Sequence, residues 1–250
     1  MLKMIQDYKK YSKEDFEVWE NLFNRQVKNL EGKAHPEYLR CLDRLDEVLN
    51  PNRIPRFEEL NEKLLAENGW SVVVVSGLIP VDQFFKLLSE KQFCSSTWLR
   101  KMSQLDYLEE PDMFHDIFGH IPLLMNPEYA KFVQQFGQLG VKYGKNKTIE
   151  KQLQRLYWFT IEFGLIRLKE RTSIYGAGII SSSGESNHIF EDEINVSPYD
   201  VEKILNNDFI TSEIQTQYYE IDSFEQLYLS VGELEKNLKE ELSDYLTEKS

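Results

Sequence analysis

Cysteine is scarce in this sequence. Only Cys41 and Cys94 occur in 250 residues, too few for the disulfide framework of a small secreted domain. We interpret both as reduced thiols that fill space in the interior. The first ten residues are polar and charged, unlike a secretory signal peptide. No apolar run approaches the roughly 20 residues that span a bilayer. These absences predict a soluble, cytoplasmic protein with no membrane partner.

Basic residues are in the minority. The chain has 29 lysines and arginines against 42 aspartates and glutamates, which gives a net charge of −13. Proteins that bind nucleic acid neutralise phosphates with clustered basic side chains. We therefore expect no nucleic-acid partner, and the acidic balance favours solubility.

Repeats, linkers and low-complexity blocks are also lacking. A chain of 250 residues can bury one sizeable core, so we predict a single domain over residues 1–250. The highly charged residues 239–250 are expected to form a frayed tail. Aromatic residues make up 13% of the chain, which is enough for a large core or an aromatic-lined pocket.

Hydrophobic spacing and capping residues predict a mainly α-helical fold with a few short β-strands. The expected helices cover residues 12–30, 37–48, 80–88, 126–143 and 148–169, with a closing helix from about residue 223. The expected strands are residues 70–75 and 214–221. Small residues dominate 174–184, which predicts a hairpin or loop.

Histidine is rare too, and two of the four histidines, His115 and His120, lie in one apolar stretch, residues 111–124. Five residues turn an α-helix about 140° past a full turn, so a straight helix cannot present both side chains together. Pro111 suits a helix start and Gly119 a helix end. This places His115 on a short helix and His120 just beyond it. The pair could be buried, hydrogen-bonded histidines or metal ligands. Of the others, we interpret His35 as a surface residue and His188 as a loop residue.

Glu162 is the only charged residue in the apolar segment 156–166. A buried carboxylate is costly unless it is paired, protonated or bound to a metal. Two imidazoles and one carboxylate match the facial triad of non-haem Fe(II) oxygenases. A zinc hydrolase could use the same ligands, although the sequence has no His-Glu-x-x-His motif. Asp112 and Asp116 flank His115. They either hydrogen-bond the metal ligands or are acidic residues at a helix N-terminus, where the helix dipole favours them.

Three segments together resemble one known family. They are residues 105–124 (LDYLEEPDMFHDIFGHIPLL), 157–164 (YWFTIEFG) and 175–182 (YGAGIISS). The sequence resembles the pterin-dependent aromatic amino acid hydroxylases, especially the short bacterial phenylalanine hydroxylases, from about residue 6 to 235. The resemblance implies a single basket-like catalytic domain, mostly helical.

The resemblance also implies roles for individual residues. The implied iron ligands are His115, His120 and Glu162. The implied substrate contacts are Arg100 and Ser181 at the carboxylate, and Pro111, Trp158, Phe163 and Gly178 around the ring. The implied pterin contacts are Gly77, Leu78, Ile79, the stacking ring of Phe84, and Asp116. Tyr157 is expected near both pterin and iron. Without the family, Arg100 would be interpreted as a surface cation and Phe84 as a core aromatic.

The implied reaction is hydroxylation of L-phenylalanine to L-tyrosine by O2, with Fe(II) and a tetrahydropterin (tetrahydrobiopterin or a related pterin). A tryptophan hydroxylase, or one acting at another ring position of phenylalanine, stays open as an alternative. A binding protein without activity is a further alternative. Neither the regulatory domain nor the tetramerisation helix of the animal enzymes is expected in this chain. We therefore expect a monomer, with separate enzymes recycling the pterin.

Three positions depart from the animal members of the family. Asp116 stands where they carry Glu, a change shared with bacterial members. Leu108 replaces a threonine on the substrate side, and Cys94 replaces a histidine on the pterin side. The last two changes put individual substrate and pterin contacts in doubt. None of the three alters the proposed metal ligands.

Overall fold

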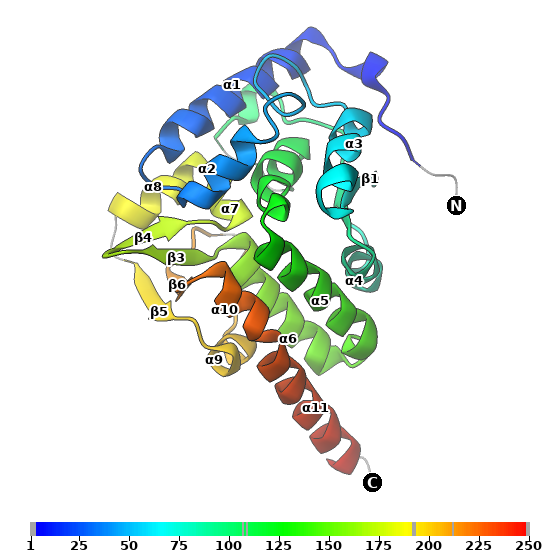
Figure 1. Ribbon diagram of the computed structural model, residues 1–250, viewed down its shortest axis with the longest axis vertical. Helices are drawn as coiled ribbons and strands as arrows, with labels where there is room; N and C mark the ends of the chain where they lie inside the picture. Colours follow the sequence, from blue (N-terminus) through cyan, green and yellow to red (C-terminus); the bar gives the residue numbers. More distant parts are fainter. Residues whose placement is uncertain (1–3, 107, 109, 192–193, 212, 249–250) are drawn as a thin grey trace.

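Helices make up most of the chain, as the sequence predicts (Figure 1). The computed structural model describes residues 4–106, 108, 110–191, 194–211 and 213–248. Its α-helices are α1 (Lys13–Leu30), α2 (Pro36–Asp43), α3 (Phe57–Asn68), α4 (Val81–Ser89), α5 (Pro127–Tyr143), α6 (Lys147–Tyr157), α7 (Ala177–Ile180), α8 (Ser183–Glu191), α9 (Val201–Asn206), α10 (Phe224–Leu229) and α11 (Val231–Glu248). Short 3₁₀ turns are η1 (Tyr8–Lys10), η2 (Met102–Gln104) and η4 (Pro122–Met125). Two π-helices are η3 (His115–His120) and η5 (Trp158–Glu162).

The strands form two small sheets. A parallel pair joins β1 (Ser71–Val74) to β2 (Gln92–Ser95). The second sheet has the order β4-β3-β6-β5, with β3 (Leu165–Leu168), β4 (Arg171–Ile174), β5 (Asn195–Pro198) and β6 (Gln217–Ile221). Strand β3 runs antiparallel to β4 and parallel to β6. In Figure 1 this sheet lies at one edge of the molecule, beside α7, α8 and α10.

Capping residues fix the helix starts that the sequence predicts. Ser12 begins α1 with a capping box, because its hydroxyl accepts from Asp15 N while the Asp15 carboxylate accepts from Ser12 N. Asn126 caps α5 with Pro127 in its first turn. These local signals need no tertiary contact, which is why the sequence predicts them well.

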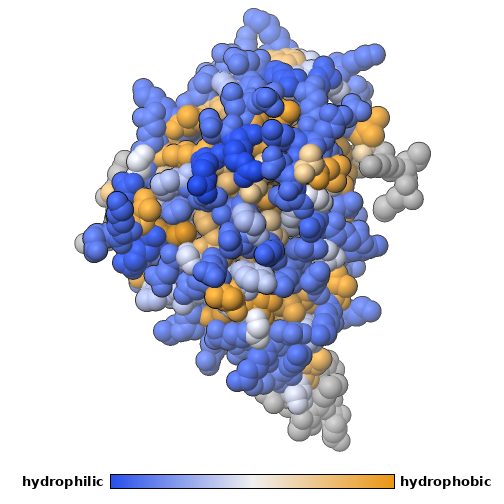
Figure 2. Space-filling model, in the orientation of Figure 1, coloured by the Kyte–Doolittle hydropathy of each residue, from blue (hydrophilic) through white to orange (hydrophobic). Residues whose placement is uncertain are grey.

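The interior is rich in aromatic rings, as the composition suggests. Trp19 of α1 contacts Phe114 edge-on, and Phe114 stacks on Phe118 with ring centroids 4.8 Å apart. On the surface in Figure 2, hydrophilic residues predominate and apolar side chains are interspersed among them. Among the residues described, no helix has both the length and the apolar character needed to cross a membrane.

Glycines let α5 approach α4 closely. A Cβ on Gly137 would lie 2.5 Å from Ser89 N, and one on Gly140 would lie 2.1 Å from the Phe85 ring. Contacts this short force the neighbouring element to move. The backbone of α5 therefore packs directly against α4, which also carries Phe84 into the cavity described below.

Gly137→Ala is expected to lower the free energy of unfolding by about 1–3 kcal/mol. Overpacking costs that much, and it outweighs the gain of up to about 1 kcal/mol from higher helix propensity. Gly232→Ala in α11 is the matched control, because no atom lies within 4 Å of the added methyl group. Urea unfolding of both variants measures the difference. A Gly137→Ala protein as stable as the Gly232→Ala protein would contradict this packing.

Several predicted elements are wrong in extent. The helix predicted over 148–169 ends as a π-helix at Glu162, and the chain then enters β3. Periodicity alone cannot separate a buried strand from a buried helix. The helical run predicted over 37–48 ends at Asp43. The predicted strand 214–221 is shorter, as β6, whereas the strand near residue 72 is confirmed as β1.

The loop and tail predictions also need correction. Residues 174–184 hold the end of β4, helix α7 and the start of α8, and His188 lies on α8 instead of a loop. His35 is half-buried and caps α2, with its Nδ1 accepting from Glu37 N. The expected frayed tail is helical to Glu248, and residues 249–250 lie outside the described part of the chain.

Candidate active site

The two π-helices hold the candidate metal ligands. In a π-helix hydrogen bonds link residues five apart, and such turns occur often at functional sites. The wide turn of η3 brings His115 and His120, five residues apart, to the same side. Gly119 is inside this turn, so its predicted role as a helix end is wrong. Its missing side chain instead admits α7, since a Cβ there would lie 2.9 Å from Ala177 O.

The start of this segment is set by Asp112. Helical residues begin at Met113, so Pro111 precedes the helix by two residues and is not its first residue. The Asp112 carboxylate accepts a hydrogen bond from His115 N at 3.1 Å. In η5, Phe163 N donates to Trp158 O, five residues back, at 2.8 Å. That bond closes the second wide turn, at whose end Glu162 projects toward the histidines.

Three donor atoms converge between these turns. The two Nε2 atoms of His115 and His120 are 3.2 Å apart. The Glu162 carboxylate lies 3.2 Å from His120 Nε2 and 3.6 Å from His115 Nε2. Within the described residues, His115, His120 and Glu162 form a group that could hold a metal ion. Two nitrogens and one carboxylate on one side of a centre fit the facial triad of non-haem iron.

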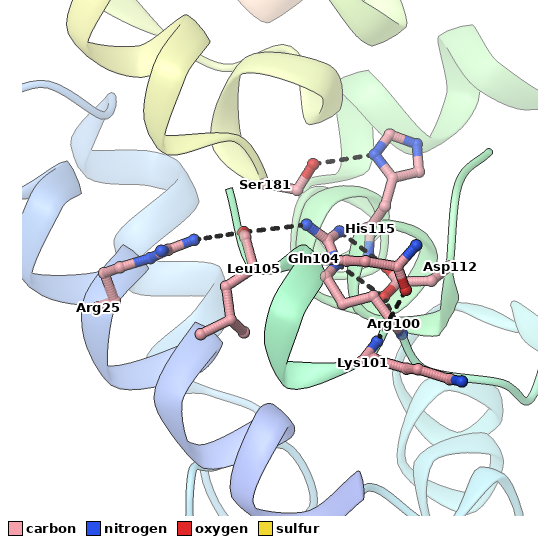
Figure 3. A network of polar contacts seen from close by, with 8 residues as sticks. All are labelled: Arg25, Arg100, Lys101, Gln104, Leu105, Asp112, His115 and Ser181. Atoms are coloured by element: carbon pink, nitrogen blue, oxygen red, sulfur yellow. Dashed lines mark hydrogen bonds and ion pairs between the residues drawn. The ribbon is translucent and has the colours of Figure 1, made fainter. Parts of the chain in front are cut away.

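Ser181 selects the metal-binding tautomer of His115 (Figure 3). The Ser181 hydroxyl donates to Ala177 O at 2.8 Å. It therefore accepts from His115 Nδ1–H, which lies 2.9 Å away. With its proton on Nδ1, His115 presents a lone pair at Nε2, as metal coordination requires. The contact to a substrate carboxylate expected for Ser181 stays a prediction.

Ser181→Ala is expected to weaken metal binding about 10–100-fold, the usual loss when a partner of a ligating histidine is removed. Anaerobic titration of metal-free protein with Fe(II) measures the change. Ser183→Ala, two residues along at the start of α8, serves as the control and should bind Fe(II) like the parent. Unchanged affinity in Ser181→Ala would show that the hydroxyl does not support His115.

Charge in the triad is balanced within the group. Burial alone would raise the pKa of Glu162, but His120 and His115 hold that pKa well below its usual range. Burial lowers the pKa of His120. For His115, burial is outweighed by the carboxylate of Glu162, and the pKa is raised. An ionised carboxylate beside two imidazoles suits a divalent cation, whose binding displaces any proton from the ligating nitrogens.

A cavity of about 400 Å³ opens above the triad. Its wall includes every residue predicted to contact pterin, together with Pro111 and Trp158 from the predicted substrate set. Asp116, also in this wall, accepts a hydrogen bond from Ser96 N at 3.0 Å, and burial raises the pKa of Asp116 to about 7.

The Tyr157 ring lies between Phe84 and His120 in the cavity wall. Its centroid is 5.3 Å from that of Phe84, which it meets edge-on, and 6.3 Å from that of His120, to which it lies nearly parallel. The expected place of Tyr157 near both pterin and iron stays a prediction.

Four predicted substrate residues lie behind this wall. Phe163 packs on Trp158 with ring centroids 4.5 Å apart. A Cβ on Gly178 would lie 3.0 Å from the Phe163 ring, so the glycine leaves room for that ring. Ser181 contacts His115, and Arg100 contacts Asp112. Their substrate roles stay predictions.

Arg100 and Asp112 form a buried two-pronged ion pair (Figure 3). Arg100 Nε lies 2.9 Å from Asp112 Oδ2 and Nη2 lies 3.0 Å from Oδ1, while Arg100 N also donates to Oδ2. Asp112 is fully buried and Arg100 is 8% exposed. Leu105 O accepts from Arg100 and from Arg25 of α1, which extends the network to the surface. Arg100 is thus not the surface cation that composition alone would suggest.

Sequence reasoning missed part of the cavity wall. Phe93 packs on His120 with ring centroids 4.6 Å apart, and Phe209 stacks on Trp158 at 4.5 Å. Phe136 of α5 and Trp98 also line the space. Residues from β2, α5 and the segment after α9 meet only through tertiary packing. Their spacing in the sequence gives no signal.

Known proteins are similar to this chain in sequence and in fold. The sequence profile described as biopterin-dependent aromatic amino acid hydroxylase matches residues 4–246. The phenylalanine-4-hydroxylase of Chromobacterium violaceum is 44% identical over 223 residues, which cover 88% of this chain and 73% of that protein. The phenylalanine-4-hydroxylase of Ralstonia nicotianae is 42% identical, over 90% of this chain and 71% of that protein.

Solved structures agree with the sequence matches. The Chromobacterium violaceum phenylalanine hydroxylase with bound Fe(III) superposes with a TM-score of 0.91 at 43% identity, covering 97% of this chain and 87% of that one. Its structure with Fe(III) and 7,8-dihydrobiopterin gives a TM-score of 0.90, with 97% and 86% covered. From its sequence, fold and triad, this chain belongs to the biopterin-dependent aromatic amino acid hydroxylase family.

Proposed function

We propose that this protein is a phenylalanine 4-monooxygenase that converts L-phenylalanine to L-tyrosine with O2. The observation that carries the proposal is the His115–His120–Glu162 triad beneath an aromatic cavity. Relatives that are 41–44% identical to this chain are named phenylalanine-4-hydroxylase. When bound, Fe(II) would activate O2, one atom of which enters the ring, and a tetrahydropterin would supply the two electrons that reduce the other atom to water.

The three ligands leave one face of the metal position open to the cavity. The half-buried ring of Phe84 offers a flat surface on which a pterin can stack. Gly77 has φ +153°, and a Cβ there would meet no atom within 4 Å, so the backbone at this edge is accessible to a ligand. Residues 77–79 and 84 are therefore our proposed pterin site, with Asp116 and Tyr157 at its inner end.

The amino acid is proposed to lie on the other side of the triad. Trp158 and Pro111 line the cavity where its ring is proposed to lie, and Phe163 supports Trp158 from behind. Arg100 is proposed to bind the substrate carboxylate, since a guanidinium fork matches that group. Asp112 holds the Arg100 fork in one orientation. Fixing both ends of the substrate presents one ring edge to the metal position.

Product identification tests the function. With Fe(II), a tetrahydropterin, O2 and each aromatic amino acid in turn, we expect tyrosine from phenylalanine and little turnover of tryptophan. Phenylalanine and tryptophan in direct competition measure the preference. Equal tyrosine formation after rigorous iron removal, or faster turnover of tryptophan, would overturn the proposal.

We further propose that the protein works as a cytoplasmic monomer and that separate enzymes recycle the pterin. Cys41 and Cys94 are both free thiols, in keeping with a reducing compartment. One chain supplies the three candidate metal ligands and the lining of the cavity, which supports activity as a monomer. Sedimentation of the active enzyme tests the oligomeric state.

A further inference from the structure

Gln215, which lies between α9 and β6, makes a polar contact with the aromatic wall formed by Trp158, Phe163 and Phe209. The Trp158 indole Nε1–H donates to Gln215 Oε1 at 2.9 Å. Gln215 is 7% exposed although it lies outside helix and strand. A buried amide in a loop needs partners for all its polar atoms.

The partners of Gln215 fix which way its amide points. Nε2 donates to Ile210 O at 2.6 Å and to Glu213 O at 3.1 Å. Both are carbonyl oxygens and can only accept, while the indole N–H can only donate. One orientation of the amide therefore satisfies all three contacts, and no carboxylate could replace it.

A second contact joins the segment between α9 and β6 to Trp158. Phe209, one residue before Ile210, stacks on Trp158 with an interplanar angle of 13°. Trp158 is thus held on one side by Phe163, on another by Phe209 and at its nitrogen by Gln215. The edge of the indole that faces the cavity is set by this arrangement.

Gln215 is itself anchored from two elements. Tyr218 of β6 donates its hydroxyl hydrogen to Gln215 O at 2.7 Å. Gln215 N donates to the Glu185 carboxylate of α8 at 3.4 Å. These two bonds hold the main chain of Gln215 between β6 and α8, so its side chain reaches Trp158 from a fixed backbone position.

We propose that Gln215 is a positioning residue that sets amino acid specificity by orienting Trp158. The proposal rests on the proposed function, in which Trp158 forms the wall for the substrate ring. Gln215 does not line the cavity and acts through the indole. Loss of its hydrogen bond lets the indole rotate and widens the space for a larger ring.

The test is a double-mutant cycle between Gln215 and Trp158. Gln215→Leu and Gln215→Met both remove all three hydrogen bonds, with Met closer to glutamine in length, and Trp158→Phe removes the indole N–H. The measured quantity is the ratio of kcat/KM for L-phenylalanine to that for L-tryptophan. Gln217→Leu is the matched control. Gln217 is a half-buried glutamine two residues away, and its side-chain amide donates to Ser197 Oγ and Tyr218 O and not to the wall.

We expect Gln215→Leu and Gln215→Met to lower this ratio about tenfold, within the range that pocket shape controls. The KM for phenylalanine should rise, whereas the KM for pterin should stay within about twofold, since the pterin side is untouched. In the Trp158→Phe background the same changes should alter the ratio by less than about twofold. Gln217→Leu should match the parent.

A ratio within about twofold of the parent in both Gln215 variants would overturn the proposal. So would a Gln215 effect that is undiminished in the Trp158→Phe background. If Gln215→Leu fails to fold, the Gln215→Met variant, which also lacks the acceptor for the indole N–H, decides the matter by the same ratio. Near-UV circular dichroism of the folded variants checks that the tryptophan environment has changed.

Failure of the proposed function gives a different result. An enzyme that prefers another aromatic amino acid contradicts that function, yet the cycle can be run with its preferred substrate. Anaerobic calorimetry of each amino acid with the iron-loaded protein gives a binding ratio without turnover. A coupling between Gln215 and Trp158 in that ratio supports the positioning role even where no tyrosine forms.

Discussion

Glu162→Ala is expected to remove both iron binding and hydroxylation. The carboxylate supplies the only negative charge among the three convergent donors, and it lies within 3.6 Å of both imidazoles. Loss of a residue that merely supports a metal ligand costs about 10–100-fold, so loss of the ligand itself should cost more. Metal analysis after Fe(II) loading and O2 uptake with phenylalanine measure the two effects.

The histidine side of the site gives the same expectation. His120→Ala should also fail to load iron, because its Nε2 is central to the group and lies 3.2 Å from both other ligands. Glu170→Ala is a suitable control for both variants, since Glu170 is exposed in the turn between β3 and β4. Full iron occupancy in Glu162→Ala or His120→Ala would show that the ligand assignment is wrong.

Arg100→Ala is expected to destabilise the fold and to abolish tight substrate binding. It leaves the Asp112 carboxylate fully buried without its cation, and breaking a buried pair in this way costs about 3–5 kcal/mol. For a chain of this size that lowers Tm by about 6–20 °C. Thermal unfolding of the variant measures the loss.

Arg100→Lys separates stability from substrate binding. Lysine keeps the charge but cannot form the fork, so we expect a smaller loss of stability and a KM for phenylalanine raised about tenfold or more. Lys13→Ala is the control, because it breaks an exposed pair with Glu17, and such pairs contribute at most about 1 kcal/mol. An Arg100→Lys enzyme with the parental KM would remove Arg100 from the substrate site.

Local chemistry made much of the fold predictable. Ser12, Asn126 and Gly144 mark helix ends through their own caps and turns, and α1 and α5 follow the predicted ranges closely. The strand near Val72 was also predictable from its β-branched run. Such signals act within a few residues, so the sequence carries them directly.

The elements that the sequence did not predict depend on distant partners. Strand β3 exists because β4 and β6 pair with it on either side. The wide turns of η3 and η5 give no periodic signal, since a π-helix differs from an α-helix by one residue in a turn. The three ligands could be proposed from residue type and burial, but their common geometry could not.

The cavity wall divides in the same way. The family resemblance predicted roles for Phe84, Trp158 and Tyr157, and the structure places these three side chains around one cavity. Phe93, Phe209 and Gln215 were not, because each belongs to a segment whose function appears only when other segments pack against it.

The two π-helices make the metal site sensitive to chain length. Each wide turn accommodates one residue more than an α-helical turn would. Two ligands of the triad lie on η3 and the third lies on η5. Deleting one residue from either turn would restore an ordinary helix and rotate the ligands apart, with little change to the composition of the core. The exact number of residues in each of these two helices is therefore as much a requirement for the iron site as the identities of the ligands themselves.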